Sequence, residues 1–555
     1  MTDAPFSQGT RAQHLAAMAA DPVDLLVVGG GITGAGIARD AAMRGLRTAL
    51  VDKGDFGSGT SGRSSRLIHG GLRYLEQGGW RLVLEASRER RTLLSIAPHL
   101  VWPRSFLFPI HAGGRLPLWK LAAGLWLYDL LALFRNVRMH RVLSKRALRR
   151  AEPSLRSHDL KGGARYYDAQ CDDTRLTLAN VRSAHEHGAL VANYAAVERL
   201  AVADGTVRGA HVVDRLNRRQ LTVRALAVVN ATGPWSDQLR GADGILPLLR
   251  RTKGAHVAVP RSRLGNHEAI ALTSPIDGRV MFILPWGDLS YIGTTDTDTT
   301  DEPDTVRATA ADVIYLLRSA NAYYPEARLQ SSDVVSTWAG LRPLLRADHA
   351  ASPSAVSREH RVVDSPSGLI SIVGGKLTTY RVMAAQVVDH VARRLQRLDG
   401  RPLSPRASTH KEPLPGGAAH DLAILAQEIE REGFTGEVAE HLVRRYGSEA
   451  PAVARLARSD VALRRPIVPG HPALRAEMVH AIRREMAVTL SDLLVRRTHV
   501  FYETPGHAVA EAPELVELAA EELGWDAARK AVELTAYLRD VEQSLAFLAE
   551  LAEQD

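Results

Sequence analysis

The sequence has little cysteine and no long apolar run, and each of these two shortages excludes classes of protein. A single cysteine, Cys171, in 555 residues excludes an intramolecular disulfide framework, a cysteine-based zinc site and an iron–sulfur cluster. No stretch supplies the roughly 20 apolar residues of a membrane-spanning helix. The N-terminus lacks the continuous apolar segment of a secretory signal. We therefore expect a protein of the reducing cytoplasm.

Charged residues are numerous and unevenly spread. The chain carries 70 Lys and Arg against 62 Asp and Glu, a net charge of +8, and only eight of the basic residues are lysines. Residues 401–555 hold 18 basic and 25 acidic side chains, a net of −7, so residues 1–400 carry +15. Residues 101–150 alone hold ten basic side chains against one acidic, a net of +9. The hydrophobic content of 45% is typical of a folded protein, and the length predicts two or three domains.

The first clear pattern is a strand, a glycine-rich turn, a helix and a second strand over residues 24–51. Gly29, Gly31 and Gly34 form G-x-G-x-x-G at the turn, and Asp52 follows the second strand. Such glycines let the backbone approach a pyrophosphate at the helix N-terminus, and the carboxylate can bind ribose hydroxyls. The pattern predicts dinucleotide binding, and by itself it leaves FAD and NAD open.

Two later segments favour FAD. Residues 228–235 (VVNATGPW) indicate a strand that runs into an Ala-Thr-Gly turn, and residues 370–376 indicate a second strand–glycine junction. With the first pattern, they resemble the glycine/D-amino-acid oxidase superfamily of FAD proteins. The resemblance implies one FAD-binding domain assembled from separate segments, with the strands of a substrate domain inserted between them.

Five further motifs follow one another along the chain. They are SSRLIHGGLRYL at 64–75, KGAH at 253–256, GTTD at 293–296, GLRPL at 340–344 and GGKLTTYR at 374–381. In this order they resemble the FAD-dependent glycerol-3-phosphate dehydrogenases. Each motif alone is modest evidence, but five together are specific, and the resemblance covers almost the whole chain from about residue 22.

The expected fold class is α/β, or α+β overall. We expect a discontinuous Rossmann-like FAD-binding domain, an inserted antiparallel-sheet substrate domain and an all-helical C-terminal domain. The expected segments are FAD-binding at 22–90, 166–235 and 366–400, a helical and basic insertion at 91–165, a substrate-binding sheet at 236–365, a linker at 401–417 and the helical domain at 418–555.

The resemblance implies oxidation of sn-glycerol 3-phosphate to dihydroxyacetone phosphate by hydride transfer to flavin N5, with electrons passed to a membrane quinone. For the hydroxyl proton it indicates His256, because a histidine can act as a base near neutral pH. His69 is the other candidate base, and Arg342 joins His256 as catalytic. Arginine suits the phosphate because its planar fork matches phosphate oxygens. The residues expected to bind substrate are Arg73, Tyr74, His256, Arg342, Arg358 and Lys376.

The same motifs imply the contacts to FAD, and no metal is expected. Asp296 and Asp298 resemble a metal loop, but the glycine and terminal glutamate of the EF-hand pattern are missing, so we expect a strand-end turn. The residues expected to bind FAD are Gly29, Gly31, Thr33, Gly34, Asp52, Lys53, Thr60, Ser61, Ser64, Ser65, His69, Gly70, Gly71, Leu72, Thr232, Gly233, Gly375, Lys376, Leu377 and Thr378.

An apolar segment lies inside the basic block, at residues 116–134. Lys120 and Asp129 interrupt it, so it should not span a bilayer. Trp119 and Trp126 could lie at a membrane interface while flanking basic residues meet anionic headgroups. The alternative is a helix pair packed on the FAD domain with solvated charges. The resemblance favours peripheral attachment at the inner face of the cell membrane, without naming the segment that attaches.

Several alternatives stay open at this point. One is an oxygen-using glycerol-3-phosphate oxidase of the same family, and another is an amine or 2-hydroxy-acid oxidase of the superfamily. A basic nucleic-acid-binding flavoprotein is disfavoured because the sequence has no RNA- or DNA-binding motif. Dimerisation and lipid docking are both possible for the C-terminal domain, so a homodimer is a possible assembly.

Overall fold

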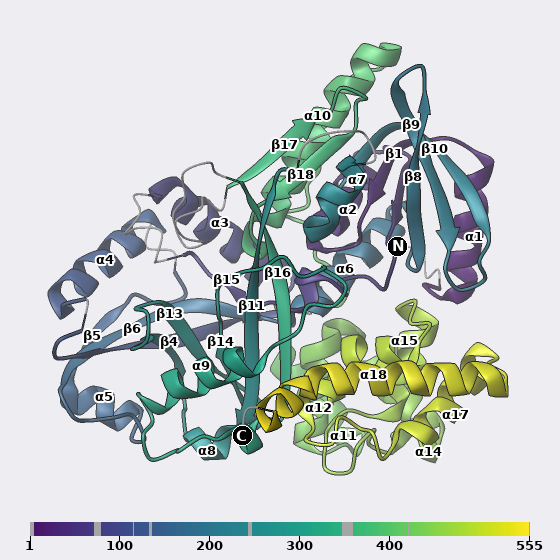
Figure 1. The fold of residues 1–555 in the computed structure, drawn as a ribbon. Coiled ribbons are helices and arrows are strands. Elements are labelled where there is room, and N and C mark those ends of the chain that lie inside the picture. The colour runs from purple at the N-terminus through teal and green to yellow at the C-terminus, as the bar shows by residue number, and fades with distance from the viewer. Residues whose placement is uncertain are drawn as a thin grey trace.

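A computed structural model of the chain forms two sheets and a helical C-terminal domain (Figure 1). Four residues expected at the site, Leu72, Arg73, Tyr74 and Arg358, lie outside the described residues. The structure describes residues 5–71, 79–114, 116–132, 136–241, 247–346, 359–419 and 421–553.

The first sheet is mostly parallel, and segments far apart in the chain build it. Antiparallel β17 (His360–Asp364) forms one edge, and antiparallel β9 (Thr206–Asp214) and β8 (Ala195–Ala203) extend β10. The parallel strands lie in the order β18 (Ile370–Gly374), β10 (Gln220–Asn230), β1 (Val23–Val28), β2 (Thr48–Val51) and β7 (Leu190–Ala192).

Helices cover this sheet, and small residues let them approach closely. The helix α2 (Ile32–Met43) connects β1 to β2, so the predicted strand–turn–helix–strand unit is confirmed. Ala35, Ala38 and Ala41 of α2 are fully buried, because an alanine face lets a helix lie close to its neighbours. The helices α6 (Asp173–Glu186) and α10 (Tyr380–Asp399) pack beside α2, and α1 (Gln8–Ala20) packs against β7 and β10.

The second sheet is largely antiparallel and lies beside the first (Figure 1). Together the two sheets confirm the predicted fold class. The strand order is β15 (Thr297–Asp298), β11 (Leu249–Pro260), β14 (Leu289–Gly293), β13 (Val280–Trp286), β12 (Ala269–Thr273), β4 (Val101–His111), β6 (Leu160–Cys171) and β3 (Leu67–Ile68), with β16 (Ser336–Leu345) paired to β11 and β5 (Arg141–Ser144) paired to β6. Its helices are α8 (Arg261–Leu264) and α9 (Ala310–Asn321).

The prediction of a helical insertion at 91–165 is wrong in part. The strands β4 and β5 and the first half of β6 lie inside it, whereas the end of α3 (Trp80–Ile96), α4 (Leu118–Leu131) and α5 (Lys145–Ala151) are helical. β4 carries Pro103 and Pro109, which disfavour a helix interior. Its aromatic and branched side chains are buried on both faces of the sheet, so no alternation marked it as a strand.

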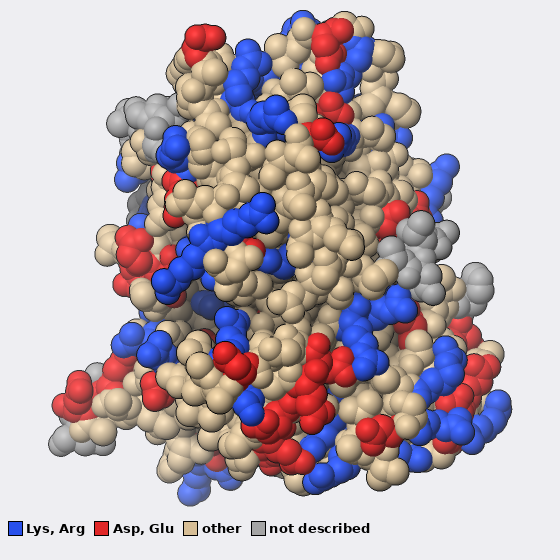
Figure 2. All heavy atoms as spheres, turned by 90° about the vertical axis from the view of Figure 1, so that its right-hand side faces the viewer, with Lys and Arg blue, Asp and Glu red and all other residues tan. Residues whose placement is uncertain are grey.

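The C-terminal domain contacts both sheets. Ser544 of its last helix exchanges hydrogen bonds with the Thr337 backbone of β16, at 3.1 Å each way. In Figure 2 acidic side chains gather beside basic ones over the lower part of the face shown, where this domain lies. Its helices are α11 (Leu422–Arg431), α12 (Gly436–Tyr446), α13 (Ala450–Ser459), α14 (Val461–Arg464), α15 (Arg475–Arg484), the π-helical turn η8 (Asp492–Arg497), α16 (Val500–Glu503), α17 (Ala512–Leu523) and α18 (Ala527–Ala552).

Candidate active site

A cavity of about 650 Å³ lies where the carboxyl ends of β1, β10 and β18 meet β11 and β16 of the second sheet. Ligands of open α/β sheets bind at this edge, because the strand ends and helix N-termini converge there. The predicted residues that line it are Gly29, Gly31, Thr33, Asp52, Lys53, Thr60, Ser61, Ser64, Ser65, His69, Thr232, Gly233, His256, Arg342, Gly375, Lys376, Leu377 and Thr378.

Three predicted residues are not part of the cavity lining and act on its shape instead. A Cβ atom at Gly34 would overlap the Gly29 carbonyl oxygen, so glycine here lets α2 lie close to β1. Gly70 donates its backbone N–H to Asp168 Oδ1 at 3.0 Å, and a Cβ there would overlap the Tyr128 hydroxyl. Gly71 follows with a φ of +77°, a conformation that favours glycine.

The glycine-rich turn leaves the N-terminus of α2 open toward the cavity. The N-cap of α2 is Gly31, which has no side chain to occupy the first helical N–H groups. Ser61 accepts one of them, from Ile32, at 2.9 Å. Gly29 has a φ of +109°, and a Cβ there would come within 2.6 Å of the Ala231 carbonyl oxygen. This backbone suits an anion, because a helix N-terminus carries partial positive charge.

Asp52 holds the turn that follows β2. Its carboxylate accepts the backbone N–H groups of Gly30 at 2.6 Å and Gly54 at 2.8 Å. Burial raises the pKa of Asp52 to about 6, although the two hydrogen bonds by themselves would lower it. Beside it, Lys53 forms an ion pair with Asp304 at 2.6 Å at the edge of the cavity. Both residues therefore shape the site from the end of β2.

The second glycine junction brings Lys376 and His69 to the same wall. Gly374 and Gly375 have φ values of +76° and +92°, so the chain turns sharply between β18 and η6 (Leu377–Thr379). Thr378 of η6 accepts the His69 backbone N–H at 3.3 Å. Both side chains line the cavity, as the motif order predicts.

Arg342 crosses from β16 over the neighbouring strand. Its Nη1 lies 3.1 Å from Asp296 Oδ1, and its Nη2 donates to Thr294 Oγ1 at 3.0 Å. A side chain at Gly254 would overlap the guanidinium, which explains the glycine of the KGAH motif. The carboxylate fixes the direction of the fork, and the planar shape of a guanidinium suits phosphate oxygens.

His256 follows Gly254 by two residues on β11, and its side chain is buried. Its Nε2 is 2.8 Å from Ser65 Oγ, and its ring stacks on Trp338 with centroids 5.1 Å apart and planes 7° apart. A Cβ at Gly293 would overlap the imidazole, so the GTTD motif makes room for it. Burial, then Arg342 and Arg66, lower the pKa of His256 to about 3. The imidazole is therefore neutral at physiological pH.

Sequence reasoning missed several residues that shape this site. Asp296 was expected only in a turn, yet its carboxylate orients Arg342. Asp173 accepts the backbone N–H and hydroxyl of Ser64, at 3.1 and 2.7 Å. Trp338 supports the histidine ring. Asp296 belongs to the GTTD motif, and that position could have indicated a role at the site. No local pattern indicates Asp173 or Trp338, because their partners are distant in sequence.

This fold, with a cavity at the carboxyl edge of its parallel sheet, is that of FAD-dependent oxidoreductases. A profile described as "FAD dependent oxidoreductase" matches residues 24–381, and one described as "C-terminal domain of alpha-glycerophosphate oxidase" matches residues 407–530. The aerobic glycerol-3-phosphate dehydrogenase of Staphylococcus aureus is 35% identical over 539 residues, 95% of this chain and 94% of that protein. The chain belongs to the family of FAD-dependent glycerol-3-phosphate dehydrogenases.

One solved structure supports this assignment, and a more distant one shares the fold. The glycerol-3-phosphate dehydrogenase of Bacillus halodurans, determined with FAD, is 33% identical with a TM-score of 0.82, covering 98% of this chain and 99% of that one. L-alpha-glycerophosphate oxidase of Mycoplasma pneumoniae is 16% identical with a TM-score of 0.54, covering 71% of this chain and 99% of that one, and shows the shared fold.

FAD is the cofactor, and the cavity fits it. The uncapped N-terminus of α2 and the glycines around it suit a pyrophosphate, and the Asp52 carboxylate lies at the end of β2 where a ribose is bound in such folds. His69, His256 and Lys376 line the same cavity. When bound, FAD supplies the two-electron acceptor for substrate oxidation.

Proposed function

We propose that this protein oxidises sn-glycerol 3-phosphate to dihydroxyacetone phosphate. The observation that carries the proposal is that cationic Arg342 and Lys376 line the same cavity as the neutral imidazole of His256. Cations bind a dianionic phosphate, and a neutral imidazole accepts a proton from a secondary alcohol. The named relatives in Staphylococcus aureus and Bacillus halodurans are dehydrogenases of this substrate and support the proposal.

The residues divide the work between binding and proton removal. Arg342 and Lys376 hold the phosphate and so place the C2 hydroxyl toward His256. Loss of a hydride from C2 and of a proton from the hydroxyl oxygen converts the alcohol to a ketone, and His256 takes that proton at Nε2. Ser65 Oγ lies 2.8 Å from Nε2 in the free enzyme and holds the ring in place, and the substrate hydroxyl replaces Ser65 at Nε2 before the proton is transferred. Arg73, Tyr74 and Arg358 remain predicted substrate contacts.

Substrate binding tunes the base. Arg342 is the charged neighbour that does most to lower the pKa of His256 after burial. A phosphate dianion bound at Arg342 offsets that positive charge, so the pKa of His256 rises when substrate is present. The imidazole thus stays neutral in the free enzyme and becomes a better proton acceptor in the complex.

The pH dependence tests this assignment. Because His256 is neutral above a pKa of about 3, the acidic limb of kcat/KM is expected to come from the substrate phosphate, which titrates near about pH 6. His256→Gln should keep that limb and lower kcat about 100-fold across the range. A limb near pH 6.5 that is present in wild type and absent in His256→Gln would show that the free histidine is charged there.

The final electron acceptor distinguishes a dehydrogenase from an oxidase. We propose that a membrane quinone accepts the electrons in this enzyme. Purified protein with sn-glycerol 3-phosphate is expected to reduce a quinone analogue under nitrogen and to form dihydroxyacetone phosphate in equal amount. In air without the analogue, hydrogen peroxide should stay far below the product formed with the analogue. Hydrogen peroxide formed in the same amount as dihydroxyacetone phosphate would identify the oxygen-using oxidase instead.

We propose that the enzyme acts at the inner face of the cell membrane and docks on an anionic membrane surface through α4. Leu121, Leu125 and Tyr128 of this helix are buried, yet Trp119 is 72% and Trp126 56% exposed. Large apolar side chains gathered on the exposed face of a helix indicate a second partner on that face. The described residues contain no helix long and apolar enough to cross a bilayer. The exposed basic residues that follow α4 in the sequence are Arg138, Arg141, Lys145, Arg146, Arg149 and Arg150.

Removing the exposed indoles tests this surface. Trp119→Ser with Trp126→Ser is expected to weaken binding to vesicles that contain phosphatidylglycerol at least about tenfold, because interfacial indoles lose apolar burial. Flotation at low and high salt measures the binding, which should also fall as salt screens the basic residues. Val461→Ser, at an 84% exposed position in the C-terminal domain, is the matched control. Equal flotation of the double variant and wild type excludes α4 as the docking helix.

A further inference from the structure

A buried cation lies behind the histidine wall of the cavity. Arg66 is 2% exposed, and four aromatic rings surround its guanidinium. Desolvated cations gain most from the faces of aromatic rings, so this cage holds the charge firmly. The distances from the guanidinium carbon to the ring centroids are 4.4 Å for Trp286, 5.1 Å for Tyr291, 5.6 Å for Tyr502 and 5.7 Å for Trp338.

The cage and the imidazole share one ring. The indole of Trp338 lies against the Arg66 guanidinium and also stacks on the imidazole of His256, with the two ring planes only 7° apart. Its Nε1 donates to the Ser64 carbonyl oxygen at 3.1 Å. The next residue, Ser65, bonds His256 Nε2 at 2.8 Å. Any shift of Trp338 therefore moves both the stacking partner and the hydrogen-bond partner of the imidazole.

The backbone around Arg66 is fixed to α6. Arg66 has a φ of +54°, an uncommon conformation for a residue with a side chain. Its N–H donates to Ser64 Oγ at 2.9 Å, and its carbonyl accepts from Cys171 N at 2.9 Å. Asp173, the first residue of α6, binds Ser64 in turn. The helix α6 and the end of β6 thus secure one side of the cage.

The C-terminal domain supplies the other side. Tyr502 of α16 meets Trp338 edge to face, with centroids 5.5 Å apart at 68°. Ser336 Oγ donates to the Tyr502 carbonyl at 3.0 Å, and Trp286 Nε1 donates to Glu503 at 2.9 Å. These contacts lock the two residues of α16 onto the second sheet.

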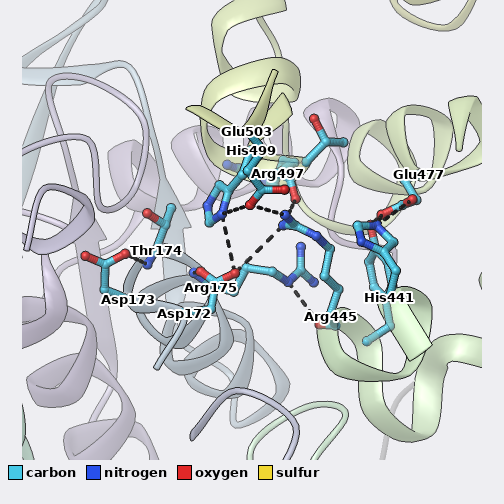
Figure 3. Close-up of polar contacts among 12 residues, drawn as sticks. Asp172, Asp173, Thr174, Arg175, His441, Arg445, Glu477, Arg497, His499 and Glu503 are labelled. Atoms are coloured by element: carbon cyan, nitrogen blue, oxygen red, sulfur yellow. Dashed lines mark hydrogen bonds and ion pairs between the residues drawn. The ribbon is translucent and has the colours of Figure 1, made fainter. Parts of the chain in front are cut away.

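A buried charge cluster holds α16 against α6. In Figure 3 His499, Glu503 and Arg445 of the C-terminal domain converge on Asp172 beside α6. Arg445 lies 3.4 Å from Glu503 and 3.8 Å from Asp172. Buried charges in such a cluster keep their geometry, because separating them exposes uncompensated charge. The position of Tyr502 is therefore set by the junction of the two domains.

We propose that Tyr502 is a positioning residue of the active site: it closes the cage around Arg66 and holds Trp338 against His256. The helical C-terminal domain then has a defined part in turnover, because it orients the imidazole that takes the substrate proton. The inference rests on the role proposed above for His256.

The test compares turnover per bound flavin with affinity for substrate. Tyr502→Leu is expected to lower kcat per bound flavin about 10- to 100-fold, since small misplacements of a reacting group cost this much, and to leave KM for sn-glycerol 3-phosphate within about twofold. Tyr502→Phe keeps the ring and should restore wild-type kcat. Tyr502→Met, closer to tyrosine in volume, serves if the leucine variant does not fold.

A second tyrosine at the same junction is the matched control. Tyr446 is also buried, but its ring lies against Arg175 at 4.5 Å and His480 at 5.1 Å instead of Arg66 and Trp338. Tyr446→Leu should lower the melting temperature and leave kcat per bound flavin unchanged. If Tyr502→Leu or Tyr502→Met matches wild type in kcat per bound flavin, or falls no further than Tyr446→Leu, the proposal is overturned. Unchanged kcat in His256→Ala would instead overturn the role of His256 itself.

Discussion

Arg342→Met is expected to raise KM for sn-glycerol 3-phosphate about 100-fold while changing kcat much less. A hydrogen bond to a charged group contributes roughly 1.5 to 3 kcal/mol, and each 1.4 kcal/mol is about tenfold in affinity. The side chain lines the cavity, and Asp296 at 3.1 Å and Thr294 at 3.0 Å fix its direction. Methionine keeps much of the length and loses both the charge and the fork, so steady-state kinetics isolate the contribution to phosphate binding.

The matched control is an arginine of the same sheet that lies outside the cavity lining. Arg250 on β11 forms an ion pair with Asp298 at 2.6 Å, and both side chains are partly exposed. Arg250→Met should leave KM within about twofold, because exposed ion pairs contribute little. An Arg342→Met enzyme with wild-type KM and flavin content would remove Arg342 from the phosphate site.

Asp55→Asn is expected to destabilise the protein by about 3 to 5 kcal/mol, because it breaks a buried ion pair and removes the closest counter-charge of Arg497. Asp55 follows β2, and its Oδ2 accepts from Arg497 at 2.7 Å and from Arg496 at 2.8 Å. Arg497 is fully buried, so water cannot replace the lost carboxylate. Calorimetry of the two forms measures the difference.

The pH dependence gives Asp55 a signature of its own. Burial by itself would raise the pKa of Asp55, but Arg497 and Arg496 outweigh burial and lower it to about 2. A lowered carboxyl pKa stabilises the folded state above the ordinary value near 4, and this stability is lost as the pH falls toward about 2. Asp55→Asn should lose that acid-dependent part of the stability. Glu522→Gln, which removes the exposed pair with Arg483, should change stability by less than about 1 kcal/mol. Similar losses in both variants would contradict the account of the junction.

The sequence predictions that rested on local patterns were the most accurate. The strand–turn–helix–strand unit over residues 24–51 matches β1, α2 and β2 because its glycines, small helix residues and apolar strands all act within one short segment. The second junction at 370–376 succeeds for the same reason, since β18 and its glycines are adjacent in sequence. The family resemblance then joined these distant pieces into one domain.

Interactions between distant segments escaped prediction. Nothing local indicates that β4 lies between β12 and β6, because a strand buried on both faces shows no alternation. Tyr502 and Arg66 meet only after the C-terminal domain packs on both sheets. With 62 arginines in the chain, the sequence also could not separate Arg66 or Arg497 from surface charge. The excess of positive charge over residues 1–400 thus includes buried structural arginines as well as the cations of the cavity.

Anaerobic reduction of the bound flavin tests the central claim most directly. Purified holoenzyme under nitrogen is mixed with sn-glycerol 3-phosphate, and absorbance near about 450 nm is followed. We expect the band to bleach as substrate is oxidised to dihydroxyacetone phosphate, with His256→Gln bleaching more slowly and to the same extent. A band that glycerol 3-phosphate leaves unchanged, while dithionite bleaches it in the same sample, would contradict the proposed substrate.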